Sequence, residues 1–162
     1  MAKIGIKCVL YRNTGTNGSP SWSAVTVIAD LTANTTWDKG PADSRSSRIK
    51  KSVKTMLGLT FSGTMKKTPD DANYEAFMNA IIADSVLDLL ILDGPSTTNG
   101  VRGWRIDAQI FEGTEDQGMS VGALYEAISI EPTDSVNEPK AVLVTGGALT
   151  YAAPGGDTAV FT

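Results

Sequence analysis

The side chains that most often carry out chemistry in proteins are scarce in this chain. It has no histidine, a single cysteine, Cys8, and eighteen Asp and Glu residues. Serine or cysteine nucleophiles usually need a nearby base, most often His, and zinc sites usually need several Cys or His ligands. The carboxylates stand in no acid–base motif, and the glycine-containing segments 113–122 and 145–156 lack P-loop or dinucleotide spacing. The sequence therefore predicts no enzyme, no metal site and no cofactor.

The most concentrated charge lies in residues 37–56, WDKGPADSRSSRIKKSVKTM, which hold six of the fourteen Lys and Arg residues. Charge is also divided along the chain. Residues 1–67 contain eleven basic and three acidic residues, a net charge of +8, whereas residues 68–162 contain three and fifteen, a net charge of −12. A basic segment of this kind could bind nucleic acid or the acidic surface of another copy. It could also be solvated and only protect an exposed strand edge from aggregation.

Self-association accounts for this charge division best. The basic segment lacks interleaved aromatic side chains on which bases could stack, and the acidic remainder would repel a phosphate backbone. A patch on one copy that meets a different patch on the next copy gives the heterologous contact from which rings and filaments are built. No apolar run is long enough to cross a membrane, so the chain is expected to be soluble and cytosolic when it is made.

The elements that position these residues are mainly strands. Sixteen glycines, seven prolines and abundant Ser and Thr favour a turn-rich β chain. Cys8 shares its phase with Ile4, Ile6 and Leu10 and is expected on a buried strand face. Alternation of apolar and polar residues predicts strands over residues 3–11, 22–29, 53–66, 86–93, 103–112, 122–132 and 140–145.

One helix is predicted over about residues 69–83. Thr68 and Asp71 are candidate helix caps, and Pro69 suits the first turn. The apolar stripe that would pack the helix on the sheet comprises Tyr74, Phe77, Met78, Ile81 and Ile82.

The order of elements predicts a mainly β fold, an antiparallel β-sandwich or barrel with one flanking α-helix. A long extended loop is expected over about residues 34–52. Residues 1–145 are expected to form a single domain, and residues 146–162 a Gly/Ala-rich C-terminal tail.

Residues 35–94, from TTWDKG to LILDG, resemble the central part of the major tail tube proteins of long-tailed bacteriophages. An extended segment with the pattern DSRSSR, at residues 43–48, leads into a long strand and a charged turn. A short helix opened by Thr, Pro and Asp follows, and then an apolar strand that closes on Asp-Gly. Residues 103–133 resemble the next part of the family, and the similarity covers roughly residues 22–133.

The resemblance implies a structural virion protein of the phage tail, assembled in the host cytoplasm. Six copies would form a ring, and rings would stack head to tail into a hollow tube through which DNA leaves the capsid. It implies other tail proteins as partners at the tube ends, no specific DNA binding, no membrane, no catalytic residue and no cofactor.

The basic loop would then contact neighbouring subunits or the adjoining ring. The interface residues expected there are Trp37, Asp43, Arg45, Arg48, Lys50 and Lys51. Lysines on a channel wall would hold the phosphate backbone of passing DNA, so the wall is expected to be neutral or acidic. Candidates for the wall or for an acidic partner patch are Asp107, Glu115 and Asp116.

Two other functions stay open. A single-ring tail terminator or connector, or a secretion-tube relative, would share the fold but differ in assembly. A monomeric carbohydrate-binding β-sandwich could use Trp22, Trp37 or Trp104 as a stacking platform, although tryptophans scattered over three elements are more often core or interface anchors.

Overall fold

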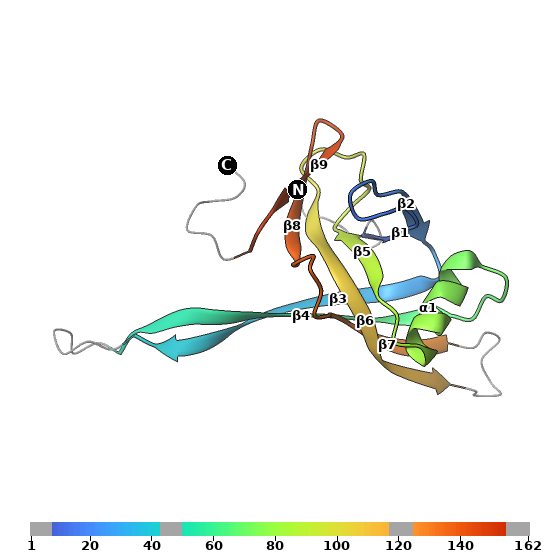
Figure 1. The fold of residues 1–162 in the computed structure, drawn as a ribbon, viewed down its shortest axis with the longest axis horizontal. Coiled ribbons are helices and arrows are strands. Elements are labelled where there is room, and N and C mark those ends of the chain that lie inside the picture. The colour runs from blue at the N-terminus through green and yellow to red at the C-terminus, as the bar shows by residue number, and fades with distance from the viewer. Residues whose placement is uncertain (1–7, 43–49, 117–124, 155–162) are drawn as a thin grey trace.

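The computed structural model describes residues 8–42, 50–116 and 125–154. These residues form nine strands, all paired antiparallel, and one helix (Figure 1). The strands are β1 (Val9–Asn13), β2 (Trp22–Val25), β3 (Ile28–Pro41), β4 (Ser52–Lys66), β5 (Leu87–Leu92), β6 (Arg102–Asp116), β7 (Tyr125–Pro132), β8 (Lys140–Thr145) and β9 (Ala148–Ala152), and the helix is α1 (Ala72–Ile82). The predicted mainly β architecture with one helix is confirmed.

The strands follow the order β2-β1-β5-β6-β7-β4-β3, and the path does not close into a barrel within the described residues. Strand β6 joins the two halves of the sheet. One of its edges pairs with β5, while its other edge pairs first with β8, through residues 102–105, and then with β7, through residues 108–116. Strand β9 pairs with β8, and β8 pairs with residues 102–105 of β6. The β8–β9 layer and the main sheet therefore meet near the start of β6.

Residues 89–92 of strand β5 are buried on both faces, which explains why this part of the strand is apolar throughout. Leu89 and Ile91 belong to the main core, which lies between the sheet and α1. Leu90 and Leu92 belong to a second core, which they share with Val101, Val142 and Val144. The second core is covered by β8 and β9, so the fold has the layered packing of a sandwich.

Helix α1 begins at Ala72, three residues later than predicted, with Asp71 as its N-cap. The Asp71 carboxylate accepts hydrogen bonds of 2.9 Å from the backbone N–H groups of Asn73 and Tyr74. The prediction of Thr68 as a cap was wrong, because its carbonyl instead accepts from the Asp71 N–H in the turn before the helix. The predicted apolar stripe is confirmed for Tyr74 and Phe77, which are buried, and wrong for Ile82, which is 80% exposed.

The cap gives a direct test of this helix start. Replacing Asp71 with Ala should lower the free energy of unfolding by about 1 kcal/mol, because two N–H groups of the first turn lose their acceptor. Urea denaturation followed by circular dichroism measures the change. Asp71→Asn is the matched control, since an Asn side chain caps about as well, and an equal loss in both variants would contradict the capping role.

Three further expectations differ in part from the structure. Cys8, which was expected on a buried strand face, is exposed and directly precedes β1. The expected tail begins with β9, which pairs with β8 through a two-residue turn at Gly146 and Gly147. Both glycines have positive φ, +60° and +79°, as the tightest hairpin turns require.

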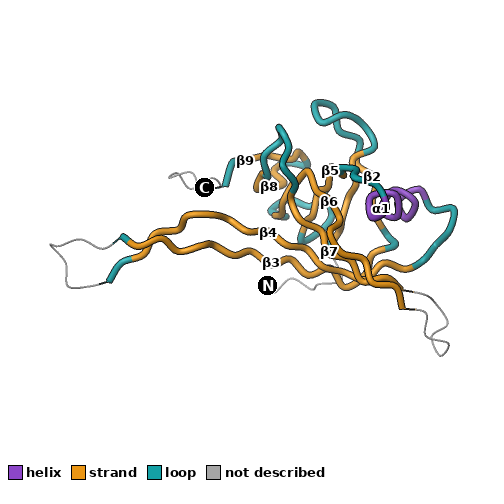
Figure 2. The backbone as a smooth tube through the Cα atoms, turned by 60° about the horizontal axis from the view of Figure 1, so that its bottom comes forward, coloured by secondary structure: helices purple, strands orange, loops and turns teal. Residues whose placement is uncertain are grey.

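The third of these expectations, a long loop over residues 34–52, is corrected in part, because residues 34–41 and Ser52 are strand and residues 43–49 lie outside the described residues. Strand β3 continues to Pro41 and β4 begins at Ser52, and the two remain paired to that point. Threonines such as Thr35 and Thr36 favour this extended pairing. The result is a long hairpin that projects from the body of the molecule (Figures 1 and 2).

Candidate assembly interface

The outer part of the β3–β4 hairpin, residues 36–42 and 50–58, is here called the arm. None of its residues is buried. Leu59 is the outermost buried residue of β4, and Val53 lies six residues beyond it, which is ~20 Å at ~3.3 Å per residue. Two apolar side chains of the arm are largely exposed, Val53 at 51% and Met56 at 71%. The arm therefore extends beyond the core of its own subunit.

The arm gathers positive charge. Lys39 lies directly across from Lys54 in the strand register, and like charges in that position repel each other. The Lys54 Nζ lies 5.2 Å from the centroid of the half-buried Trp37 ring, a cation–π contact. Lys50 and Lys51, in the segment that leads into β4, are also exposed. A negatively charged partner would relieve this repulsion.

The position of these lysines bears on the edge-guard explanation. Within the arm both β3 and β4 are edge strands, because β4 pairs with β7 only through residues 61–66. The described basic residues of the arm are Lys39 on β3, Lys54 on β4, and Lys50 and Lys51 just before β4, and these are positions at which an edge guard would also lie. The edge-guard explanation therefore stays open beside the partner explanation.

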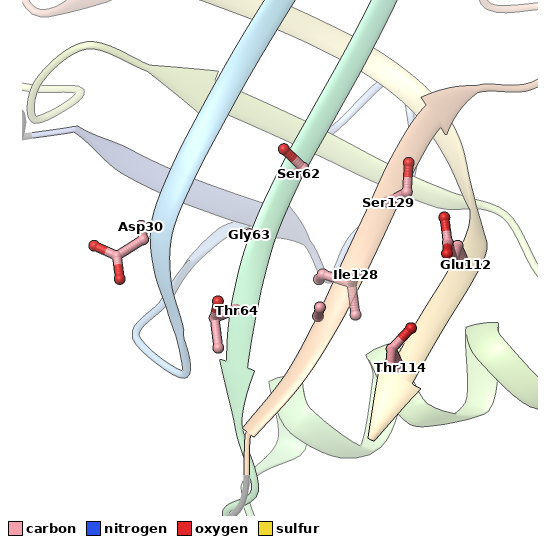
Figure 3. Close-up of a pocket in the computed structure, with 9 residues that line it drawn as sticks. Asp30, Ser62, Gly63, Thr64, Glu112, Thr114, Ile128 and Ser129 are labelled. Carbon is pink, nitrogen blue, oxygen red and sulfur yellow. The ribbon is translucent and has the colours of Figure 1, made fainter. Parts of the chain in front are cut away.

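Strands β3, β4, β7 and β6 present a polar face on the side away from the main core. The register places Ser62, Ser129 and Glu112 in one row across three of these strands, and Thr64, Ala127 and Thr114 in the next. These six residues, here called the polar face, line a shallow groove with Asp30 at its margin (Figure 3). None of the nine residues that line the groove is basic, and two of them, Asp30 and Glu112, are acidic.

Three acidic residues were predicted for a wall or partner patch. Asp107 and Glu115 do not line that groove, and nothing is described of the Asp116 side chain. Asp107 is buried, and it accepts hydrogen bonds from Ser135 Oγ at 2.6 Å and from Asn137 Nδ2 at 2.8 Å. It anchors a loop, so its expected exposed role was wrong. Glu115 is exposed and forms an ion pair with Lys67. The side chain of Asp116 is outside the described residues.

Of the six predicted interface residues, three lie in the described arm. These are Trp37, Lys50 and Lys51, and their role in assembly stays a prediction. Asp43, Arg45 and Arg48 fall in residues 43–49, outside the described residues. Glu112, which the sequence did not single out, lies just past a register shift in β6 that places it on the polar face.

A buried charge cluster holds the two layers together near β6. Arg105 is 8% exposed and makes a two-point contact with Asp88, of 2.6 Å from Nη2 and 3.0 Å from Nε. Its guanidinium lies 5.1 Å from the Trp22 ring and 5.4 Å from the Tyr151 ring. The hydrogen bonds that Arg105 donates to Asp88 raise the pKa of Arg105, and burial raises the pKa of Tyr151. The contacts among these side chains therefore stabilise the fold.

The three tryptophans do not form a common platform. Trp22 stacks on Arg105, Trp37 lies under Lys54 in the arm, and Trp104 packs against the main core. This arrangement disfavours the carbohydrate-binding alternative. Within the described residues, no group of three His, Cys, Asp or Glu is placed to hold a metal ion, and no helix is long and apolar enough to cross a membrane.

No family model and no curated protein matches the sequence, but the fold is similar to that of several solved structures. The SPP1 tail tube superposes with a TM-score of 0.65 and 13% identity, over 80% of this chain and 75% of that one. The tail of an empty gene transfer agent particle, refined with C6 symmetry, gives 0.65 and 11%, over 94% and 100%. The tube terminating cap of the anti-feeding prophage gives 0.60 and 9%, over 94% and 93%. The chain therefore has the tail tube fold.

Proposed function

We propose that this chain is a structural subunit of a phage tail tube, which self-assembles into hexameric rings that stack head to tail. The observation that carries the proposal is an exposed basic arm on a subunit with the tail tube fold, together with acidic surface elsewhere on the same chain. The C6 symmetry of the similar gene transfer agent tail supports six copies in a ring. No catalytic residue or cofactor enters this role.

Open strand edges supply a way to join subunits within a ring. The outer edge of β3 has no partner among the described strands, and neither does the edge of β6 beyond Ala108, where its pairing with β5 ends. Unpaired edges are templates for another chain. When β3 of one copy adds to β6 of the next, the four strands β3, β4, β7 and β6 of each copy become part of one continuous sheet.

The polar face of that sheet would line the channel. Its hydroxyl groups and the Glu112 carboxylate offer passing DNA a neutral to acidic surface, which does not hold the phosphate backbone. The basic arm would instead face other subunits. The assembled protein would reside in the virion tail and be made in the host cytoplasm, with other tail proteins at the tube ends.

Microscopy of the purified chain tests this function. At high concentration, negative-stain images should show long tubes, and a cryo-electron map of those tubes would show whether Ser62 and Glu112 face the channel. The similar fold of the anti-feeding prophage cap supports a single-ring terminator as the second candidate. Rings that never stack would favour that candidate, and a chain that stays monomeric at every concentration and salt would refute both.

A further inference from the structure

We propose that the arm of one copy docks on an apolar patch at the far end of the next copy, where α1 ends beside β6. This patch, here called the helix-end patch, consists of Ile82, Val86 and Phe111. The inference rests on the proposed tube function and names the surface that receives the arm.

The helix-end patch is assembled by one contact between two elements. The Gln109 side chain of β6 donates a hydrogen bond to the Asp84 carboxylate just after α1. Ile82 and Val86 lie two residues to either side of Asp84, and Phe111 lies two residues beyond Gln109. Their side chains are 80%, 49% and 61% exposed. Phe111 is exposed at the register shift in β6, on the stretch that β5 no longer covers.

The arm and this patch account for most of the large apolar surface that the subunit leaves in water. Six large apolar side chains are exposed among the described residues. Two are in the arm, three are in the helix-end patch, and one, Val136, lies in the loop between β7 and β8. Burying Val53 and Met56 against the patch would remove apolar surface of both partners from water, which stabilises the contact.

Charge complements the apolar match. The arm carries Lys39 and Lys54, whose mutual repulsion is not offset by an ion pair within the described residues. Asp84 lies between Ile82 and Val86 in the sequence and is exposed. An apolar centre with opposite charges around it on the two partners steers the arm to this surface rather than to another.

The shape of the subunit makes a second copy the occupant. The arm projects from one end of the molecule, whereas α1 and the end of β6 lie at the other end (Figures 1 and 2). An arm therefore cannot reach the patch of its own subunit. Two different surfaces at opposite ends of one chain give a heterologous contact that repeats from copy to copy, as a stacked assembly needs.

Cross-linking between cysteines tests the contact. In a Cys8→Ser background, assembled Met56→Cys/Phe111→Cys protein should react with a short bismaleimide to give a ladder of dimers, trimers and longer chains on a denaturing gel. The matched control is Met56→Cys/Val136→Cys, in which the second cysteine is at least as exposed but lies outside the patch. We expect about tenfold or more cross-linked product in the first protein, because docking raises the local concentration of the two thiols.

The outcomes separate this contact from the tube function. Tubes that form but give no ladder, or the same ladder in both proteins, overturn the docking contact and leave the tube function standing. A chain that neither assembles nor cross-links overturns both. A mixture of Met56→Cys and Phe111→Cys single variants should give dimers but no longer species, and longer species there would also count against the contact.

Discussion

A chain that combines Lys39→Glu and Lys54→Glu is expected to stay folded and to lose tube assembly. The two lysines lie opposite each other on the exposed arm, so the double change replaces one like-charge pair with another and leaves the internal repulsion nearly unchanged. Within the subunit the loss is limited to the cation–π contact of Lys54 with Trp37, worth about 0.5 to 1 kcal/mol when it is exposed. The effect should therefore fall on contacts between subunits.

Those contacts should weaken strongly. If the arm meets acidic surface, attraction at two positions becomes repulsion, which costs several kcal/mol. Since every 1.4 kcal/mol is a factor of ten, the concentration needed for assembly should rise by about 100-fold or more. Sedimentation of assembled protein measures that concentration, and circular dichroism verifies the fold. Added salt should weaken the unmodified tubes for the same reason.

A charge-matched variant separates the arm from net charge. Lys66→Glu combined with Lys140→Glu also takes the formal net charge from −4 to −8, but both positions lie outside the arm. That protein should assemble at a concentration within a few-fold of the unmodified chain. If both double variants lose assembly equally, only net charge matters, and if the arm variant assembles normally, the arm has no electrostatic role.

The strands and the helix could be predicted because their signals are local. The alternation from Val53 to Met65 is a property of β4 alone, and the apolar run of β5 requires only that both of its faces be covered. The acidic residues before α1 likewise mark a helix start, although the cap is Asp71 rather than Thr68. Such patterns give the type of an element and its buried face without knowledge of its neighbours.

The features that depend on a partner strand were missed. Threonines and a tryptophan in residues 34–41 look like an extended loop until β4 pairs with them, and Glu112 reaches the polar face only because β6 holds one extra residue opposite β7. The strand β9 was hidden in the same way, since Ala148–Ala152 has a strand partner only once the Gly146-Gly147 turn brings β8 beside it. Register is a relation between segments, so one segment's sequence does not contain it.

Arg105 and Asp107 show a second limit. In the alternation of residues 103–112 both lie on the face opposite Ile106 and Ala108, which belong to the main core, and such a face is normally read as solvent-exposed. A second layer covers it, so both residues are buried; Arg105 donates hydrogen bonds to distant segments, and Asp107 accepts them from another. Charge in an amphipathic strand therefore marks exposure only where no other layer packs on that face.

The largest effect on stability is expected from Asp88→Ala, which should lower the free energy of unfolding by about 3 to 5 kcal/mol. The change leaves the Arg105 guanidinium buried between the Trp22 and Tyr151 rings without its carboxylate. It also removes the acceptor of a 2.8 Å hydrogen bond from Asn13 Nδ2. Urea denaturation measures the loss, and Asp134→Ala, at an exposed position, is the control and should stay within about 0.5 kcal/mol of the unmodified protein.

The cost of Asp88→Ala should come from the stranded charge rather than from the lost contact itself. Removing both partners, as in Asp88→Leu/Arg105→Met, replaces the pair with apolar groups and should recover most of the stability, because a buried ion pair gains little over well-packed apolar side chains. If the double variant is as unstable as Asp88→Ala, the pair is needed for its hydrogen bonds, including the 2.9 Å bond from Arg105 Nη2 to the Asn17 carbonyl. If Asp88→Ala costs no more than Asp134→Ala, water reaches the guanidinium, and the cluster does not hold the two layers together.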